Sequence, residues 1–84
     1  MPARRVMCEE ELAFNVQIGR RIGELRKRRG LSQSKLADLV GIGQPQLFGY
    51  EVGAVRCPVF RLRLIASAVG VPVQALIPDN HNLL

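Results

Sequence analysis

At 84 residues with a formal net charge of +5, the chain is small and basic, and 48% of its residues are hydrophobic. That length accommodates one domain with a thin core and leaves little room for a second. The excess of Lys and Arg favours an acidic partner, either nucleic acid or an anionic membrane surface, although a merely soluble basic protein would show the same balance.

The inventory of reactive side chains argues against an enzyme and against a metal or cofactor site. Cys8 and Cys57 lie far apart, and His81 is the one histidine, so no metal-ligand spacing occurs. The sequence contains no Ser/His/Asp set, no convergent pair of carboxylates and no glycine-rich phosphate loop. Two lone cysteines, the lack of a secretory signal and the lack of a long apolar run together predict a soluble cytoplasmic protein.

A basic tail over residues 1–8 precedes the single domain predicted over residues 9–78, and residues 79–84 form a second tail. The first helix is predicted to run from about Glu9 to Gly30, where glycine supplies the stop. Its cationic last turn suits the negative end of the helix dipole. The apolar residues expected on its inner face recur at helical spacing, namely Leu12, Val16, Ile18, Ile22 and Leu25.

Two short helices follow, joined by a tight turn. Ser32 is a good N-cap residue for the first of them, because its hydroxyl accepts a hydrogen bond from a backbone N–H one turn on. Gly41 is the expected left-handed residue at its end. The second is predicted from Gln44 to about Glu51, with Pro45 in the first turn, where its missing N–H costs nothing. The expected inward residues of the pair are Leu36, Ala37, Leu39, Val40, Leu47 and Tyr50.

Pro58 opens a fourth predicted helix and Gly70 closes it, and a brief fifth helix is predicted between Pro72 and Pro78. The apolar stripe of the fourth helix is expected to contain Val59, Leu62, Ile65, Ala66 and Val69. No alternation of period two competes over more than a few residues. The sequence therefore predicts an all-α fold of five helices with short connections.

Three segments carry a family resemblance: IGRRIGELRKRRGLSQSKLADLVG, GQPQLFGYEVG and LIASAVGVPVQAL, which between them cover most of residues 18–77. In them the chain resembles the Cro/C1-type (XRE-like) helix-turn-helix domain of lambdoid phage repressors, controller proteins and antitoxins. The resemblance implies a compact five-helix lambda-repressor-like domain with the helix-turn-helix in helices 2 and 3. It also implies binding to operator DNA, usually as a two-fold dimer.

The resemblance implies base-reading residues in the helix predicted from Gln44, the recognition helix. Gln44 matches the first such position, and a glutamine amide pairs with both N6 and N7 of adenine in the major groove. Gln46 is expected as a second reader. Phe48 stands where a small or polar residue is usual, and it suits either a thymine methyl or a partner protein. Outside this motif, both glutamines would be ordinary solvated surface.

The resemblance also implies contacts with the DNA backbone and one structural ion pair. Arg26 and Glu51 match a pair that holds the first helix against the recognition helix. The basic run at the end of the first helix, like Arg4 and Arg5 in the tail, is otherwise expected to be solvated and to add nonspecific attraction. The phosphate contacts expected at the start of the second helix and in the loop after the recognition helix are Ser32, Gln33, Lys35 and Arg56.

The start of the fourth helix is the candidate dimer surface. Val59, Phe60 and Arg63 lie there, and the family commonly dimerises through this region. The fifth helix and Leu83–Leu84 are further candidates. For Val59 the intramolecular core is the favoured alternative, whereas for Phe60 both alternatives stay open.

Two further departures, together with Phe48, make the predicted recognition surface more apolar than the family pattern. Gly49 stands where Arg, Lys or Gln often contacts a base or a phosphate, and Val52 stands where Asn or a charged residue is frequent. The sequence predicts a transcriptional regulator, a repressor that binds a palindromic operator as a homodimer. The alternative is an antitoxin or another protein-interaction module of the same fold. Arg on several faces of the first helix argues against a third alternative, a helix on a membrane surface.

Overall fold

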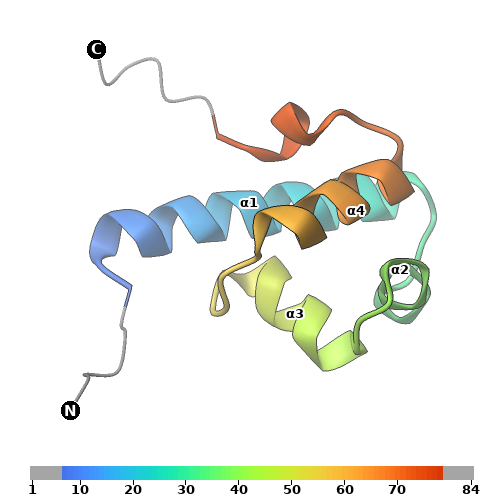
Figure 1. Cartoon of the computed structure of the whole chain (residues 1–84), viewed down its shortest axis with the longest axis horizontal. Coiled ribbons are helices and arrows are strands. Elements are labelled where there is room, and N and C mark those ends of the chain that lie inside the picture. Colours follow the sequence, from blue (N-terminus) through green and yellow to red (C-terminus); the bar gives the residue numbers. More distant parts are fainter. Residues whose placement is uncertain (1–6, 79–84) are drawn as a thin grey trace.

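The computed structural model describes residues 7–78, which form four α-helices and one short 3-10 helix and contain no strand (Figure 1). The elements are α1 (Glu9–Arg28), α2 (Gln33–Val40), α3 (Gln44–Val52), α4 (Val59–Val69) and η1 (Val73–Leu76). The all-α prediction is confirmed for these residues. None of the described helices is both long and apolar enough to pass through a bilayer.

The prediction of five α-helices is wrong, because the fifth segment forms only a 3-10 turn. Pro72 precedes η1 with extended backbone, and Pro78 follows it directly after Ile77. A residue that precedes proline is driven out of helical geometry, so Ile77 is extended and cannot prolong the turn. Most of the two predicted tails, with Leu83–Leu84, lies outside the described residues.

Local signals fix the turn between α2 and α3. The Oγ of Ser32 accepts a hydrogen bond from the backbone N–H of Lys35 at 3.0 Å, which caps α2 as predicted. Gly41 ends α2 with φ 75°, a left-handed conformation that glycine adopts without steric cost. Pro45 lies in the first turn of α3. The two helices therefore form the predicted helix-turn-helix.

The other elements hold this helix pair on one side of the molecule. In Figure 1, α1 and α4 cross the middle of the view together, and α2 and α3 lie below them. α3 packs against α1 and α2, while α4 packs against α1, α2 and η1. The lower side of α3 and its N-terminal end are not covered by another described element in this view. The fold therefore supports α3 from behind and presents its outer side.

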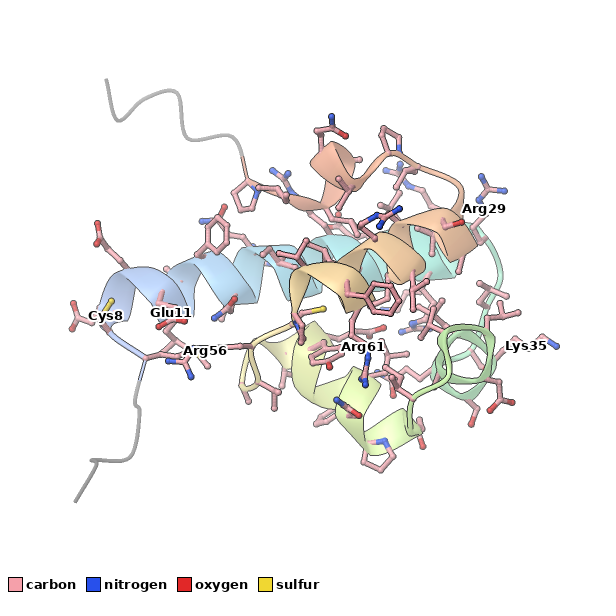
Figure 2. The ribbon with its side chains drawn as sticks, viewed as in Figure 1. Cys8, Glu11, Arg29, Lys35, Arg56 and Arg61 are labelled. Atoms are coloured by element: carbon pink, nitrogen blue, oxygen red, sulfur yellow. The ribbon has the colours of Figure 1, made fainter. Side chains whose placement is uncertain are left out.

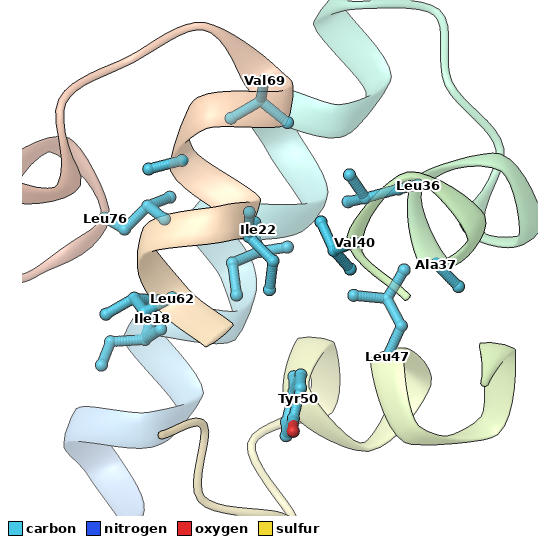
Figure 3. Close-up of a cluster of buried hydrophobic side chains, with 12 residues drawn as sticks. Ile18, Ile22, Leu36, Ala37, Val40, Leu47, Tyr50, Leu62, Val69 and Leu76 are labelled. Carbon is cyan, nitrogen blue, oxygen red and sulfur yellow. The ribbon is translucent and has the colours of Figure 1, made fainter. Parts of the chain in front are cut away.

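One hydrophobic core joins all the described elements (Figure 3). Each element contributes at least one side chain with no exposed surface, and the five are Ile22, Leu36, Leu47, Ile65 and Leu76. Burying an aliphatic side chain of this size stabilises a fold by about 1.5–3 kcal/mol. Because the helices share these contacts, α3 cannot change its orientation without disturbing α1 and α2.

Three residues predicted to face inward are exposed instead. Leu12 is 46% exposed, Leu39 is 56% exposed and Val59 is 73% exposed. Leu39 lies just outside the narrow stripe of α2 that Leu36 and its neighbours form. Leu12 and Val59 lie near the first turns of their helices, where the other described elements do not cover them. The preference for a core position at Val59 was therefore wrong.

α1 approaches the end of α3 closely at Gly19. A Cβ atom built on Gly19 would lie 2.3 Å from the backbone oxygens of both Tyr50 and Glu51. Real side chains do not come that close to backbone atoms, so only glycine lets α1 meet the last part of α3 here. This contact sets the distance between the two helices.

We expect Gly19→Ala to lower the free energy of unfolding by about 1–3 kcal/mol, because the added methyl must push α3 away from α1. This loss outweighs the gain in helix propensity, which is about 1 kcal/mol. Urea unfolding followed by circular dichroism measures it. Gly43→Ser is the matched control: its Cβ would meet only Pro45 Cδ, at 3.7 Å, and serine suits an N-cap position. Equal stability of the two variants would contradict the steric account.

Candidate nucleic-acid interface

A chain of hydrogen bonds runs from α1 to the end of α3, then to the first residue of α2, and back to the first residue of α3. Arg26 Nε donates to Glu51 Oε2 at 2.7 Å, and Arg26 Nη2 donates to Glu51 Oε1 at 3.1 Å. Gln33 Nε2 donates to the same Oε1 at 3.0 Å. Gln44 Nε2 then donates to Gln33 Oε1, also at 3.0 Å. The four side chains form one connected relay that ends at the solvent-exposed Gln44.

The first link of this relay is the ion pair that the sequence predicted. Only 10% of the Arg26 side chain and 9% of the Glu51 side chain are exposed, so both charges have lost most of their water. Arg26 Nη1 also donates to the carbonyl oxygen of Leu31 at 2.9 Å, which ties the turn before α2 to the same group. The pair therefore positions α1, the α2 entrance and α3 relative to one another.

The relay also orients the Gln44 amide. Its Nε2 points toward Gln33, and an amide nitrogen carries two hydrogens. A second N–H and the carbonyl oxygen of Gln44 remain for a neighbouring molecule. A donor beside an acceptor is the pattern that pairs with adenine N7 and N6 in the major groove. Gln33, expected at a phosphate, lies half-buried inside the relay.

Gln46 lies on the opposite flank of α3 from Phe48. Its Nε2 donates to the Tyr50 hydroxyl at 2.8 Å, and Arg61 Nη1 of α4 approaches the same oxygen at 3.5 Å. The Gln46 side chain thus points along α3 toward α4. Its carbonyl oxygen makes no hydrogen bond with another described residue. Figure 2 shows Arg61 at the border between α4 and α3.

The outer side of α3 is apolar. Phe48 is 53% exposed and Val52, one turn further, is 47% exposed. Gly49, at the position where the family often has a side chain that contacts a base or a phosphate, is buried. A Cβ on Gly49 would lie 2.7 Å from Cγ2 of Val55, a residue of the loop after α3. Val55 therefore covers the place where a side chain at position 49 would project.

Val55 is a residue of this surface that sequence analysis missed. The glycine in the middle of α3 was the available signal, since glycine inside a helix often permits a close approach of another group. The same glycine's carbonyl oxygen accepts backbone hydrogen bonds from Ala54 and Val55, at 3.0 and 3.3 Å. The loop thus folds back on α3 through its backbone as well as its side chain.

The remaining phosphate candidates lie at two edges of this surface. Ser32 and Lys35 are exposed at the start of α2, where the Ser32 hydroxyl is already used as the helix cap. Arg56 donates to both carboxylate oxygens of Glu11, at 2.5 and 3.1 Å, and Figure 2 shows the two side chains together near the N-terminal end of α1. This hydrogen bond raises the pKa of Arg56, which stays cationic. A phosphate at Arg56 would share the guanidinium with Glu11 or displace it.

Lys27, Arg28 and Arg29 of the basic run are exposed, as expected. Two arginines nevertheless bind backbone carbonyls: Arg29 in this run, and Arg21 before it. Arg29 Nε donates to the carbonyl oxygen of Val69 at the end of α4, and Arg21 Nη1 donates to that of Ile77, each at 2.8 Å. Cations at these carbonyls satisfy acceptors that a helix end leaves open. The two arginines fasten α4 and the segment after η1 to α1.

The expected dimer residues are exposed at the start of α4. Phe60 is 63% exposed, close to the value for Val59, and Arg63 is also exposed. Cys57 lies just before them and is half-buried, which raises the pKa of its thiol to about 11. The thiol is therefore neutral at pH 7.

A helix-turn-helix family model (HTH_3) matches residues 22–76, which include α2, the turn and α3. This chain belongs to the Cro/C1-type helix-turn-helix family. The helix pair and its glycine turn both lie within the matched residues.

Several members of this family are similar over most of the chain. An uncharacterized HTH-type transcriptional regulator of Sinorhizobium medicae is 35% identical over 66 residues, which are 79% of this chain and 48% of that protein. The transcriptional repressor RstR of the cryptic phage CTXphi, from Vibrio cholerae, is 30% identical over 61 residues, 73% of this chain and 55% of RstR. The chain therefore spans about half the length of the curated relatives it matches.

Solved structures agree with the fold. The restriction–modification controller protein C.AhdI from Aeromonas hydrophila superimposes with a TM-score of 0.75 and is 32% identical. The match covers 77% of this chain and 98% of that chain. The two chains therefore share their fold over the matched part.

We expect Glu51→Ala to lower the free energy of unfolding by about 3–5 kcal/mol, because Arg26 would remain buried without its partner charge. Denaturant unfolding measures this loss. Glu11→Ala removes the carboxylate of the more exposed pair and should cost far less stability, because water screens that pair. If the two variants were equally stable, the Arg26–Glu51 pair would not be the structural link described here.

Proposed function

We propose that this chain is a DNA-binding transcriptional regulator that inserts the N-terminal end of α3 into the major groove. The observation that carries the proposal is the relay that ends at Gln44. It holds an exposed amide in one orientation at the end of a helix that the rest of the domain supports from behind. An amide that a hydrogen bond already orients is suited to base recognition, since it has less conformational entropy to lose on binding.

The positions of the cations support the proposal. α3 itself has no Lys or Arg. Arg20 and Lys27 of α1 border a hollow that Phe48 and Val52 also line, and Arg61 of α4 lies on the opposite flank. A helix in the major groove has a phosphate backbone on each side. Cations on the elements that flank α3, with no Lys or Arg on α3 itself, suit a helix in that location.

We propose further that the protein acts as a homodimer on a two-fold symmetric operator. Two large apolar side chains, Val59 and Phe60, are exposed next to each other at the start of α4. Self-association would remove them from water. Two copies of α3 would then meet half-sites about one helical turn apart on one face of the duplex.

We propose repression as the regulatory outcome. We also propose that the protein acts in the cytoplasm. Similarity to the repressor RstR supports repression. A small domain that covers an operator excludes other proteins from that stretch of DNA without any further activity.

A protein-interaction module is the second candidate function. The exposed Phe48 and Val52 favour it, because a partner protein would cover them on binding. Such a partner would occupy the same side of α3 as DNA, so the two ligands would compete.

We expect Gln44→Ala to weaken binding to the preferred operator by about 1–3 kcal/mol and to leave binding to random DNA nearly unchanged. Titrations of a selected duplex and of a scrambled duplex at two salt concentrations measure both. Arg56→Ala is the comparison: it should weaken binding to both duplexes and reduce the salt slope by about one phosphate contact. Equal losses on both duplexes for Gln44→Ala would mean that this residue reads no base.

We expect Phe60→Asp to convert the proposed dimer into a monomer. The new carboxylate of each subunit would be buried against the apolar surface of its partner, without a compensating charge. Sedimentation at several protein concentrations detects this change. Leu39→Asp alters an equally exposed apolar residue of α2 and should leave the assembly unchanged. A wild-type protein that sediments as a monomer on operator DNA would rule out the homodimer.

A further inference from the structure

The outer side of α3 carries a continuous apolar area to which the proposed DNA-binding function assigns no role so far. It consists of Phe48, Val52 and Val55, called here the α3 apolar surface. Phe48 and Val52 are one helical turn apart, and Val55 lies over Gly49, which is next to Phe48 in sequence and one turn from Val52. All three side chains are between 44% and 53% exposed.

The same helix lacks the groups that recognise G·C pairs. In the major groove, guanine is read by Arg or Lys, and the cytosine amino group is read by Glu or Asp. α3 contains no Lys or Arg, and its one carboxylate, Glu51, is held by Arg26 and Gln33. Gln44 is the polar group oriented for a base edge, and its amide matches adenine.

The thymine 5-methyl group is the apolar feature that a base pair presents in the major groove. An apolar side chain therefore gains contact with thymine and gains nothing from the other bases. Each methyl group removed from water contributes about 0.8 kcal/mol, or about fourfold in affinity. Three adjacent apolar side chains beside one adenine-reading amide favour runs of A·T pairs.

We propose that α3 recognises a half-site of A·T pairs, with Gln44 on adenine and the α3 apolar surface on thymine methyl groups. This inference rests on the DNA-binding function proposed above. Phe48 and Val52 are the specificity-determining residues, and Val55 takes the place of the missing side chain at position 49. The operator is thus distinguished by methyl groups as much as by hydrogen bonds.

Charge favours DNA as the occupant of this surface over an apolar protein partner. The hollow beside Phe48 and Val52 is bordered by Arg20 and Lys27, with Glu24 among its other lining residues. The oriented amide of Gln44 lies on the same helix. Three side chains are also a small area, whereas a stable protein interface buries about 800 Å² on each partner. The duplex instead gains its main affinity from the phosphates around the groove.

The test begins with selection of duplexes that bind the full chain from a random library. Each thymine of the selected half-site is then replaced by deoxyuridine, which removes only the 5-methyl group. We expect affinity to fall about fourfold at one to three positions. In Phe48→Ala or Val52→Ala, replacement at the contacted position should cause no further loss, because the methyl contact is already gone. Leu39→Ala, which alters an exposed residue of α2, should keep the full sensitivity to deoxyuridine.

The possible results separate this inference from the proposed function. Failure to select any sequence, with only weak binding to all duplexes, would reject both. A selected half-site that is rich in G·C pairs, or one that binds equally well with deoxyuridine at every thymine, would leave DNA binding intact and overturn the inference. Circular dichroism of each variant tests whether the helices are retained. If both alanine variants lost helix, the deoxyuridine series with wild-type protein would decide whether thymine methyl groups are contacted.

Discussion

The contact on which the presentation of α3 depends is the ion pair between Arg26 and Glu51. It joins the end of α1 to the end of α3, and the same guanidinium holds the turn before α2 through Leu31. A buried pair of this kind adds little net stability, because both charges lose their hydration. Its value is positional: Glu51 also fixes Gln33, and Gln33 fixes Gln44. A group in the interior thus determines how an amide on the surface is aimed.

Electrostatics around α3 divides into two parts. The helix that faces outward is nearly free of charge, while cations lie on the neighbouring elements α1, α4 and the loop after α3. This division separates attraction from discrimination, because phosphates are the same in every sequence and base edges are not. Glu11 adds a constraint on one of these cations, since Arg56 already has a carboxylate partner that resembles a phosphate in charge. Under the proposed function, the affinity of Arg56 for a DNA phosphate would be the difference between that contact and the existing contact with Glu11.

Local chemistry made much of the fold predictable, and tertiary contacts account for the rest. The Ser32 cap and the left-handed Gly41 act within a few residues, so the sequence located both ends of α2. The Arg26–Glu51 pair followed from the resemblance to a known domain, which no local pattern would have indicated. The contact of Gly19 with α3 and the cover of Gly49 by Val55 depend on segments that are far apart or fold back, and periodicity does not report such distances. For the same reason, helical spacing placed Leu39 and Val59 in a core that ends before it reaches them.

Positions 49 and 55 are sterically coupled, because Gly49 has no side chain and Val55 occupies the space where one would project. A longer side chain at 49 would meet Val55 before it met any ligand. If α3 contacts bases as proposed, a new side chain at 49 would need a smaller residue at 55, so a change of base preference here would take two coordinated substitutions, one in the helix and one in the loop. A side chain at 49 would therefore first have to displace the loop residue Val55 from the outer side of α3.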